Sequence, residues 1–286
     1  MFIVLLLLSA SVLQLPAQQT ESGHKPFGEL TAKAEAGDAD SEYQVGLRYY
    51  DGEGVAKDFS EAVKWFRKTA EQNLAKGQYN LGVCYANGQG VEKDEVEAVK
   101  WYRKAAEQNL AEAQNSLGFC YKDGHGVMKD EVEAVKWYRK AADQNLAQGQ
   151  YNLGVCYANG HGVVKDEVEA VKWYRKAAEQ NLAQAQNSLG FRYENGDGVA
   201  KDEMEGVKWY RKAAEQNLAQ AQYNVGVCYA FGQGVAKDEV EAYKWFLLAG
   251  AQGEEGAKKN MAVLESRLTR EQIAEGQKMA RNFKPR

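Results

Sequence analysis

The spacing of the tryptophans constrains the fold more than any other feature of the sequence. All six lie 36 residues apart, at Trp65, Trp101, Trp137, Trp173, Trp209 and Trp245. A fixed period of this length is typical of a solenoid, in which each repeat is one supersecondary unit that buries its apolar face by stacking on its neighbours. The spacing therefore predicts one elongated array of repeats.

Each repeat carries the signals of two helices. Asp94 can accept hydrogen bonds from the first free backbone N–H groups of the second helix, and Glu97 three residues later completes a pattern typical of a capping box. The same Asp-x-x-Glu pair recurs in every full repeat, so a helix start explains these carboxylates better than metal binding or acid/base catalysis. Asn109 and its equivalents, all Asn or Gly, predict a left-handed residue where the second helix ends. Because the three prolines lie outside the repeats or at their very end, the array is predicted to be helical throughout.

The repeat pattern A-x-x-x-x-x-L-G-x-x-Y-x-x-G-x-G-V-x-x-D-x-x-x-A-x-x-W-Y-x-x-A-A resembles the Sel-one-like repeat, a relative of the tetratricopeptide repeat. The match covers six full repeats, residues 34–249. The resemblance implies an all-α fold, a right-handed α/α solenoid of antiparallel helix pairs with 36-residue repeats. It also implies that the array is used mainly to hold proteins or peptides.

Residues 250–286 depart from the pattern and are predicted to form divergent capping helices. In the sixth repeat, Leu247 and Leu248 stand where Arg and Lys stand in earlier repeats, so another part of the chain must cover them. The sequence TREQ from Thr269 is typical of a capping box that opens a last helix. A solenoid requires a polar terminal cap of this kind for solubility.

The N-terminal residues predict export. Residues 1–17 read as a secretory signal peptide, because an apolar stretch precedes a small-residue site at Leu15-Pro16-Ala17. Residues 18–33 follow as a spacer and an N-terminal partial helix. The apolar stretch is short for a membrane span, so no stable span is expected after signal cleavage. The predicted location is periplasmic or secreted, and cytoplasmic if the signal is not functional.

The positions that vary between repeats are those free to carry function. On the first helix, repeats alternate between Tyr and Asn at one position and between Val and Phe four residues later, which gives a 72-residue superperiod. By resemblance to tetratricopeptide arrays, this stripe would line a concave groove. The alternative is that the alternating side chains fit neighbouring repeats together and contact no ligand. The candidate groove residues are Tyr43, Tyr50, Tyr79, Asn115, Phe119, Tyr151, Asn187, Phe191, Tyr223 and Phe231.

A stripe of aromatic and amide side chains indicates a binding surface. Such residues are common at protein interfaces and peptide grooves, so the favoured function is a non-enzymatic scaffold or adaptor that binds a protein or an extended peptide. A cell-wall glycan could stack on the same aromatic residues and is the alternative partner. A formal net charge of −4 gives no electrostatic signal for nucleic acid. No cofactor is expected.

Few residues offer catalytic chemistry. Only three histidines are present, and His125 and His161 occupy equivalent loop positions of a kind that is usually solvated surface. The one Ser-x-x-Lys pattern begins at Ser22 in the predicted spacer, and no Ser-Asp-Asn or Lys-Thr-Gly follows, as β-lactamase chemistry would need. A weak hydrolase of cell-wall amides or β-lactams is therefore the least favoured function, and the chain is predicted not to be an enzyme.

The four cysteines, Cys84, Cys120, Cys156 and Cys228, occupy one repeat position. Neighbouring helices pack about 8–10 Å apart, which exceeds the roughly 7 Å between Cα atoms that a disulfide can bridge. The cysteines are therefore predicted to be free thiols, and no metal site is expected.

Overall fold

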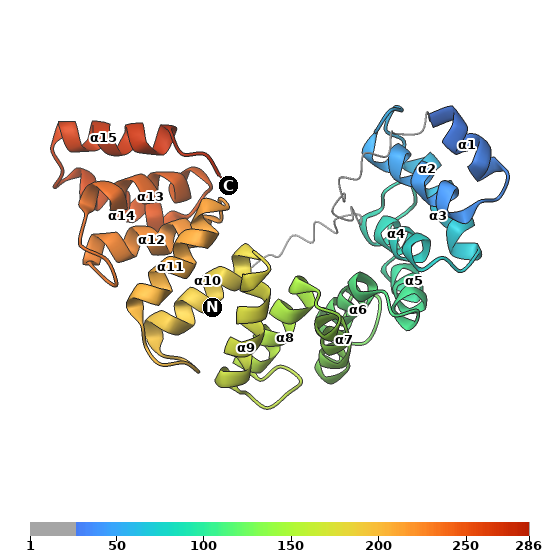
Figure 1. Ribbon diagram of the computed structural model, residues 1–286, viewed down its shortest axis with the longest axis horizontal. Coiled ribbons are helices and arrows are strands. Elements are labelled where there is room, and N and C mark those ends of the chain that lie inside the picture. The colour runs from blue at the N-terminus through green and yellow to red at the C-terminus, as the bar shows by residue number, and fades with distance from the viewer. Residues whose placement is uncertain (1–26, 286) are drawn as a thin grey trace. The chain divides into compact units, whose positions relative to one another are not determined.

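The computed structural model describes residues 27–285, and in this range it contains helices and no β-strand (Figure 1). The helices are α1 (Phe27–Glu35), α2 (Ala39–Asp51), α3 (Phe59–Glu71), α4 (Ala75–Asn87), α5 (Glu95–Glu107), α6 (Ala111–Asp123), α7 (Glu131–Asp143), α8 (Ala147–Asn159), α9 (Glu167–Glu179), α10 (Ala183–Asn195), α11 (Glu203–Glu215), α12 (Ala219–Phe231), α13 (Glu239–Ala251), α14 (Glu255–Glu265) and α15 (Arg270–Arg281). The even-numbered helices α2–α12 are the first helices of the repeats and the odd-numbered helices α3–α13 are the second. This arrangement confirms the predicted all-α solenoid of helix pairs. The predicted signal peptide and residues 18–26 of the spacer lie outside the described residues.

The ends of the second helices follow the predicted chemistry with one correction. Asp94 Oδ1 accepts from the Glu97 backbone N–H at 2.9 Å, as a helix cap should. The Glu97 side chain does not reciprocate, because its carboxylate pairs with Lys100 Nζ at 2.8 Å. A true capping box is present at the start of α15, between Thr269 and Gln272. The predicted left-handed residues are confirmed, with φ of 66° at Asn109.

Each repeat packs its two helices through a close approach at glycine. A Cβ placed on Gly82 in α4 would lie 2.8 Å from the ring of Tyr102 in α5, so only glycine lets these helices come this close. On the other side of the second helix, Trp137 is buried, and Lys140 Nζ lies 3.9 Å from its ring centroid. The lysine of this repeat position therefore covers the indole ring of its own helix.

A buried glutamine links successive helices in the second to sixth repeats, and Glu42 stands at its position in the first. Gln114 in α6 is 1% exposed, and its Nε2 donates to Ala106 O at 3.2 Å and to Asn109 Oδ1 at 3.1 Å. Its Oε1 accepts from Gln144 Nε2 at 2.7 Å. The amide thus satisfies its hydrogen-bonding groups without water and ties the end of α5 to α6 and to the end of α7.

The chain divides into two compact units, Met1–Gln144 and Asn145–Arg286. The described part of the first contains α1–α7 and that of the second contains α8–α15. In the second compact unit, Leu247 packs against the same buried cluster as Met261 of α14 and Ile273 of α15, and Leu248 packs against the same cluster as Phe283. The C-terminal helices therefore supply the cover that these leucines need. Among the residues that the structure describes, no helix is both long and apolar enough to cross a membrane.

Candidate functional site

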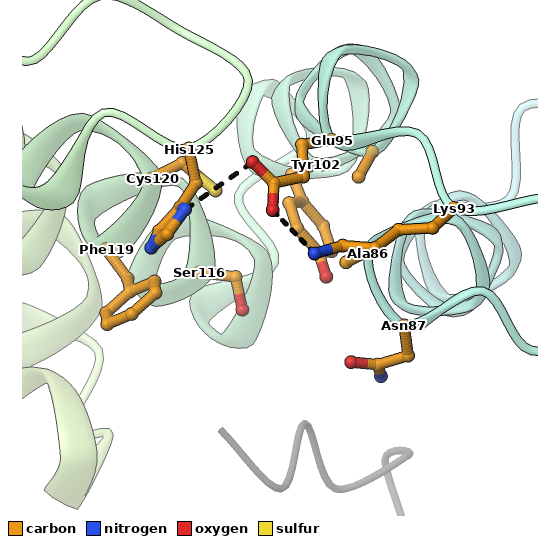
Figure 2. Close-up of a pocket in the computed structure, with 10 residues that line it drawn as sticks. Ala86, Asn87, Lys93, Glu95, Tyr102, Ser116, Phe119, Cys120 and His125 are labelled. Carbon is orange, nitrogen blue, oxygen red and sulfur yellow. Dashed lines mark ion pairs between the residues drawn. The ribbon is translucent and has the colours of Figure 1, made fainter. Parts of the chain in front are cut away.

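A pocket opens on the first-helix stripe of the first compact unit. It has a volume of about 230 Å³ and lies between the end of α4, the start of α5 and helix α6 with its following loop (Figure 2). This volume is below the roughly 300–1,000 Å³ of sites for drug-sized ligands, so it suits a single side chain. The lining residues are Ala86, Asn87, Lys93, Glu95, Ala98, Tyr102, Ser116, Phe119, Cys120 and His125.

An ion-paired carboxylate forms one wall of the pocket. Glu95, the first residue of α5, binds Lys93 Nζ at 2.8 Å and lies 3.5 Å from His125 Nδ1, as the dashed lines in Figure 2 show. The hydrogen bond from the Lys93 ammonium lowers the pKa of the Glu95 carboxyl, and His125 acts in the same direction. Glu95 is therefore a carboxylate at neutral pH.

Stacked rings form a second wall. The rings of Phe119 and His125 have centroids 5.5 Å apart and planes that differ by 16°. The loop position of His125 predicts solvated surface, and its side chain is indeed 47% exposed. The fold nevertheless makes it a pocket residue, because the loop after α6 packs on the start of α5. Sequence reasoning missed this role, since nothing in the repeat pattern shows that this loop reaches Glu95.

Tyr102 places an unpaired hydroxyl in the pocket. The residue is 4% exposed, and within the described part of the chain no group accepts a hydrogen bond from its hydroxyl. Burial raises the pKa of Tyr102 well above its ordinary value, so the hydroxyl keeps its proton. In Figure 2 it points to the same side of the pocket as the Ser116 hydroxyl. The hydroxyl faces the open pocket, where an atom of a ligand that accepts its hydrogen bond would complete the site.

The pocket is open because two small side chains meet there, Ala86 and Cys120. In the preceding repeat, Tyr50 stands at the position of Ala86 and fills the equivalent space. Its ring lies 5.0 Å from that of Phe59, and its hydroxyl donates to Gln89 Oε1 at 2.6 Å. In the first repeat, the side chain of Tyr50 therefore occupies the space that is open in the pocket.

Charged side chains fill the equivalent spaces within the second compact unit. Glu194, at the position of Ala86, accepts from the Tyr210 hydroxyl at 2.7 Å. Arg192, at the position of Cys120, lies with its guanidinium carbon 6.0 Å from the Tyr174 ring centroid and pairs with Asp197. One substitution at either position thus decides whether such a space is filled.

The ten candidate groove residues differ in how far they are exposed. Tyr43, Tyr50 and Tyr79 are between 4% and 8% exposed, so they pack between repeats, as the alternative hypothesis expects. Phe191 and Phe231 are 46% and 72% exposed. The half-buried candidates are Asn115, Phe119, Tyr151, Asn187 and Tyr223, of which Phe119 lines the pocket.

The 72-residue alternation has a packing cause. Tyr79 forms a hydrogen bond with Ser116 of the next repeat, and Tyr151 does so with Ser188. Where Asn187 replaces the tyrosine, the next repeat has Asn224, whose Nδ2 donates to Asn187 Oδ1 at 2.9 Å. At these junctions a tyrosine therefore meets a serine, or two asparagines meet each other, whereas at the first junction Tyr43 accepts from Asn80 Nδ2 at 3.2 Å.

Cys120 and His125 share the pocket, but their chemistry does not suit nucleophilic catalysis. Burial, together with the nearby Glu95 and Asp123 carboxylates, raises the pKa of the Cys120 thiol to about 12. A cysteine nucleophile needs the opposite shift, because the thiolate is the reactive form. Among the described residues, no group of three or more His, Cys, Asp and Glu side chains could hold a metal ion. The arrangement suits binding.

The buried thiols give a prediction for chemical modification. Burial raises the pKa of Cys84, Cys120 and Cys228 to about 12 from an ordinary 9.0. We expect iodoacetamide at pH 8 to alkylate them at least a hundredfold more slowly in the folded protein than in denaturant, measured by mass spectrometry. Because the unfolded chain loses these protons near pH 9 and the folded chain only near 12, the free energy of unfolding should fall as the pH rises through this window. Rapid alkylation without denaturant would contradict the observed burial.

Comparison with protein families matches most of the chain. The Sel1 repeat matches six consecutive segments, residues 39–74, 75–110, 111–146, 147–182, 183–218 and 219–254. Comparison with curated proteins finds no match.

Solved structures show the same fold. A protective antigen present in uropathogenic Escherichia coli strains, which displays an SLR fold, is 36% identical with a TM-score of 0.79, and the match covers 89% of this chain and 55% of the antigen. The chain therefore spans about half the length of that protein. A Sel1 repeat protein from Oxalobacter formigenes is 32% identical with a TM-score of 0.71, over 79% of this chain and 97% of that one. An immunity protein from Pseudomonas aeruginosa shares the fold at 20% identity and a TM-score of 0.50, over 77% of this chain and 83% of its own.

Proposed function

Because the chain belongs to the Sel1 repeat family, whose solenoids are typically protein-interaction scaffolds, we propose that it is a non-enzymatic scaffold for an extended segment of a partner protein. The segment lies along the first-helix stripe, and one of its side chains enters the pocket between α4, α5 and α6. Location outside the cytoplasm, as the N-terminal sequence predicts, belongs to the same proposal.

The pocket is the observation that carries this proposal. It combines a half-buried aromatic wall at Phe119 with the polar groups of Glu95 and His125, all within a space the size of one side chain. Small recognition pockets of this kind, apolar with a few placed polar groups, are typical of sites that anchor a partner by one residue. The exposed Phe191 and Phe231 offer further apolar contacts on first helices of the second compact unit.

Peptide selection tests the function. We expect a display library of short, unstructured peptides to yield binders whose affinity falls about tenfold or more in Phe119→Ala, since truncating an aromatic at the centre of a contact commonly costs that much. Val132→Ala is the matched control, because Val132 is 55% exposed at the start of α7, a second helix away from the stripe. Affinity is measured by fluorescence anisotropy, and the helical melting curve of each variant shows that the fold is kept.

Other outcomes would redirect the proposal. Binding that is lost in Val132→Ala and kept in Phe119→Ala would place the partner on the second helices. If no peptide is selected, but the protein sediments with purified cell wall and Phe119→Ala abolishes this, the partner is a glycan.

A further inference from the structure

The unpaired hydroxyl of Tyr102 defines what the pocket lacks. At the equivalent position three repeats later, the Tyr210 hydroxyl donates to Glu194 Oε2 at 2.7 Å. This partner is a carboxylate supplied by the chain itself. Tyr102 is also buried, but it lines the pocket with Ala86, whose methyl group cannot accept a hydrogen bond.

The site around Glu194 is a filled copy of the pocket. Glu194 stands at the position of Ala86, three repeats later, and four neighbouring positions besides Asn195 for Asn87 carry the same residues. These equivalents are Tyr210 for Tyr102, Glu203 for Glu95, Lys201 for Lys93 and Cys228 for Cys120. The copy differs at the positions of Ala98, Ser116, Phe119 and His125, but the groups that surround the Glu194 carboxylate, the tyrosine and the Lys–Glu pair, are present in the pocket.

The local charges are compatible with an incoming anion. In the filled copy, Lys201 Nζ pairs with Glu203 at 2.8 Å, and Glu194 is accommodated beside this pair. The pocket repeats the pair, with Lys93 Nζ also 2.8 Å from Glu95. The Lys93 ammonium offsets the negative charge of Glu95, so the electrostatic repulsion between Glu95 and a second carboxylate in the pocket is reduced.

We infer that the pocket binds a carboxylate of the partner segment, which accepts the hydrogen bond of Tyr102. On the precedent of Glu194, the carboxylate belongs to a glutamate side chain. The inference rests on the proposed function for the source of this group. It adds a specificity that the scaffold function alone does not contain, namely a preference for an acidic residue at one point of the segment.

An aromatic occupant, on the precedent of Tyr50, fits less well. Tyr50 packs its ring between Phe59 and Phe66. The pocket has Glu95 and Tyr102 at these two positions, so a ring would lie against a carboxylate and would leave the Tyr102 hydroxyl without an acceptor. A carboxylate satisfies this hydroxyl through a charge-assisted bond.

A double-mutant cycle tests the inference. Selected peptides are compared with versions in which each Glu is replaced by Gln, and both are titrated against the native protein and Tyr102→Phe. We expect Tyr102→Phe to lower the affinity of the Glu peptide about tenfold and to leave that of the Gln peptide within about twofold. The fold tolerates this change, because Phe66 and Phe246 occupy the same position in other repeats.

A second variant fills the pocket from within. Ala86→Glu reproduces the Glu194 arrangement, so we expect the Glu peptide to lose at least tenfold in affinity, whereas the control Ala86→Ser keeps the pocket open and keeps binding. Capped glutamate, N-acetyl-glutamate N-methylamide, is a probe that needs no selected peptide. At millimolar concentration it should shift the NMR signal of labelled Tyr102, and capped glutamine should not.

The outcomes separate this inference from the scaffold function. If peptides bind equally well with Glu or Gln, the pocket does not recognise a carboxylate. The same conclusion follows if the selected peptides carry tyrosine and their affinity does not change in Tyr102→Phe. Either result leaves the scaffold function in place. Loss of affinity on amidating the C-terminus, with no effect of Glu→Gln, assigns the carboxylate to the chain end. A shift of Tyr102 by capped glutamate without any selected peptide supports the site and removes the scaffold function. No binding of any probe overturns both.

Discussion

Gly126→Ala should lower the free energy of unfolding by about 2–5 kcal/mol. The left-handed φ of 66° costs an alanine roughly 1–2 kcal/mol. In addition, a Cβ at this position would overlap the backbone carbonyl of Glu95, 2.0 Å away, so the loop after α6 would have to move off the start of α5. Overpacking of this kind costs roughly a further 1–3 kcal/mol. Denaturant unfolding followed by circular dichroism measures the change.

Gly124→Ala is the matched control for this prediction. Gly124 lies two residues earlier with a similar φ of 79°, but its Cβ would meet Lys129 Cβ at 3.3 Å and no backbone atom closer than 3.6 Å. We expect it to lose only the roughly 1–2 kcal/mol of the left-handed conformation. Equal losses in the two variants would show that the contact between the loop and α5 contributes nothing.

Gln114→Leu should cost about 3 kcal/mol, the second largest effect. The substitution removes the donor to Ala106 O and Asn109 Oδ1 and the acceptor for Gln144 Nε2, and leaves these groups with fewer partners in a site that is 1% exposed. Each buried polar group left unpaired costs roughly 1–3 kcal/mol, which the apolar leucine offsets only in part. Thermal and denaturant unfolding provide the measurement.

The same change at an exposed glutamine serves as the control. Gln44 lies on the surface of α2, so Gln44→Leu should alter the free energy of unfolding by no more than about 0.5 kcal/mol. If both substitutions have the same small effect, the buried amides are not a stabilising part of the repeat.

The fold could be predicted from the sequence because its signals are local. The Asp at the start of each second helix and the Asn at its end act within a few residues, and the structure has a cap at Asp94 and a left-handed residue at Asn109. The predicted reciprocal bond from Glu97 was wrong, because Lys100 one turn later offers its carboxylate a stronger partner. Local sequence patterns identify the groups with which a side chain can form a hydrogen bond or an ion pair, but not which of these partners it binds in the structure.

The pocket could be predicted only in part. The stripe on the first helices drew attention to Phe119, which lines it. His125 and Glu95 come from a loop and a helix start in different repeats, and their meeting depends on how closely the loop packs at Gly126. The burial of Tyr43, Tyr50 and Tyr79 likewise depends on the distance between helices, which periodicity does not contain.

The space beside Tyr102 also bears on how such arrays diverge. Duplication of a repeat copies the helix caps, the glycine contacts and the buried glutamine together, whereas the position of Ala86 carries Tyr, Ala, Lys or Glu in repeats that are otherwise alike. A lineage can therefore gain a recognition site by shortening one side chain and lose it by lengthening that side chain again. In an architecture of this kind, a new binding specificity arises when a side chain that fills the space between neighbouring repeats becomes shorter, and the residues that maintain the fold need not change.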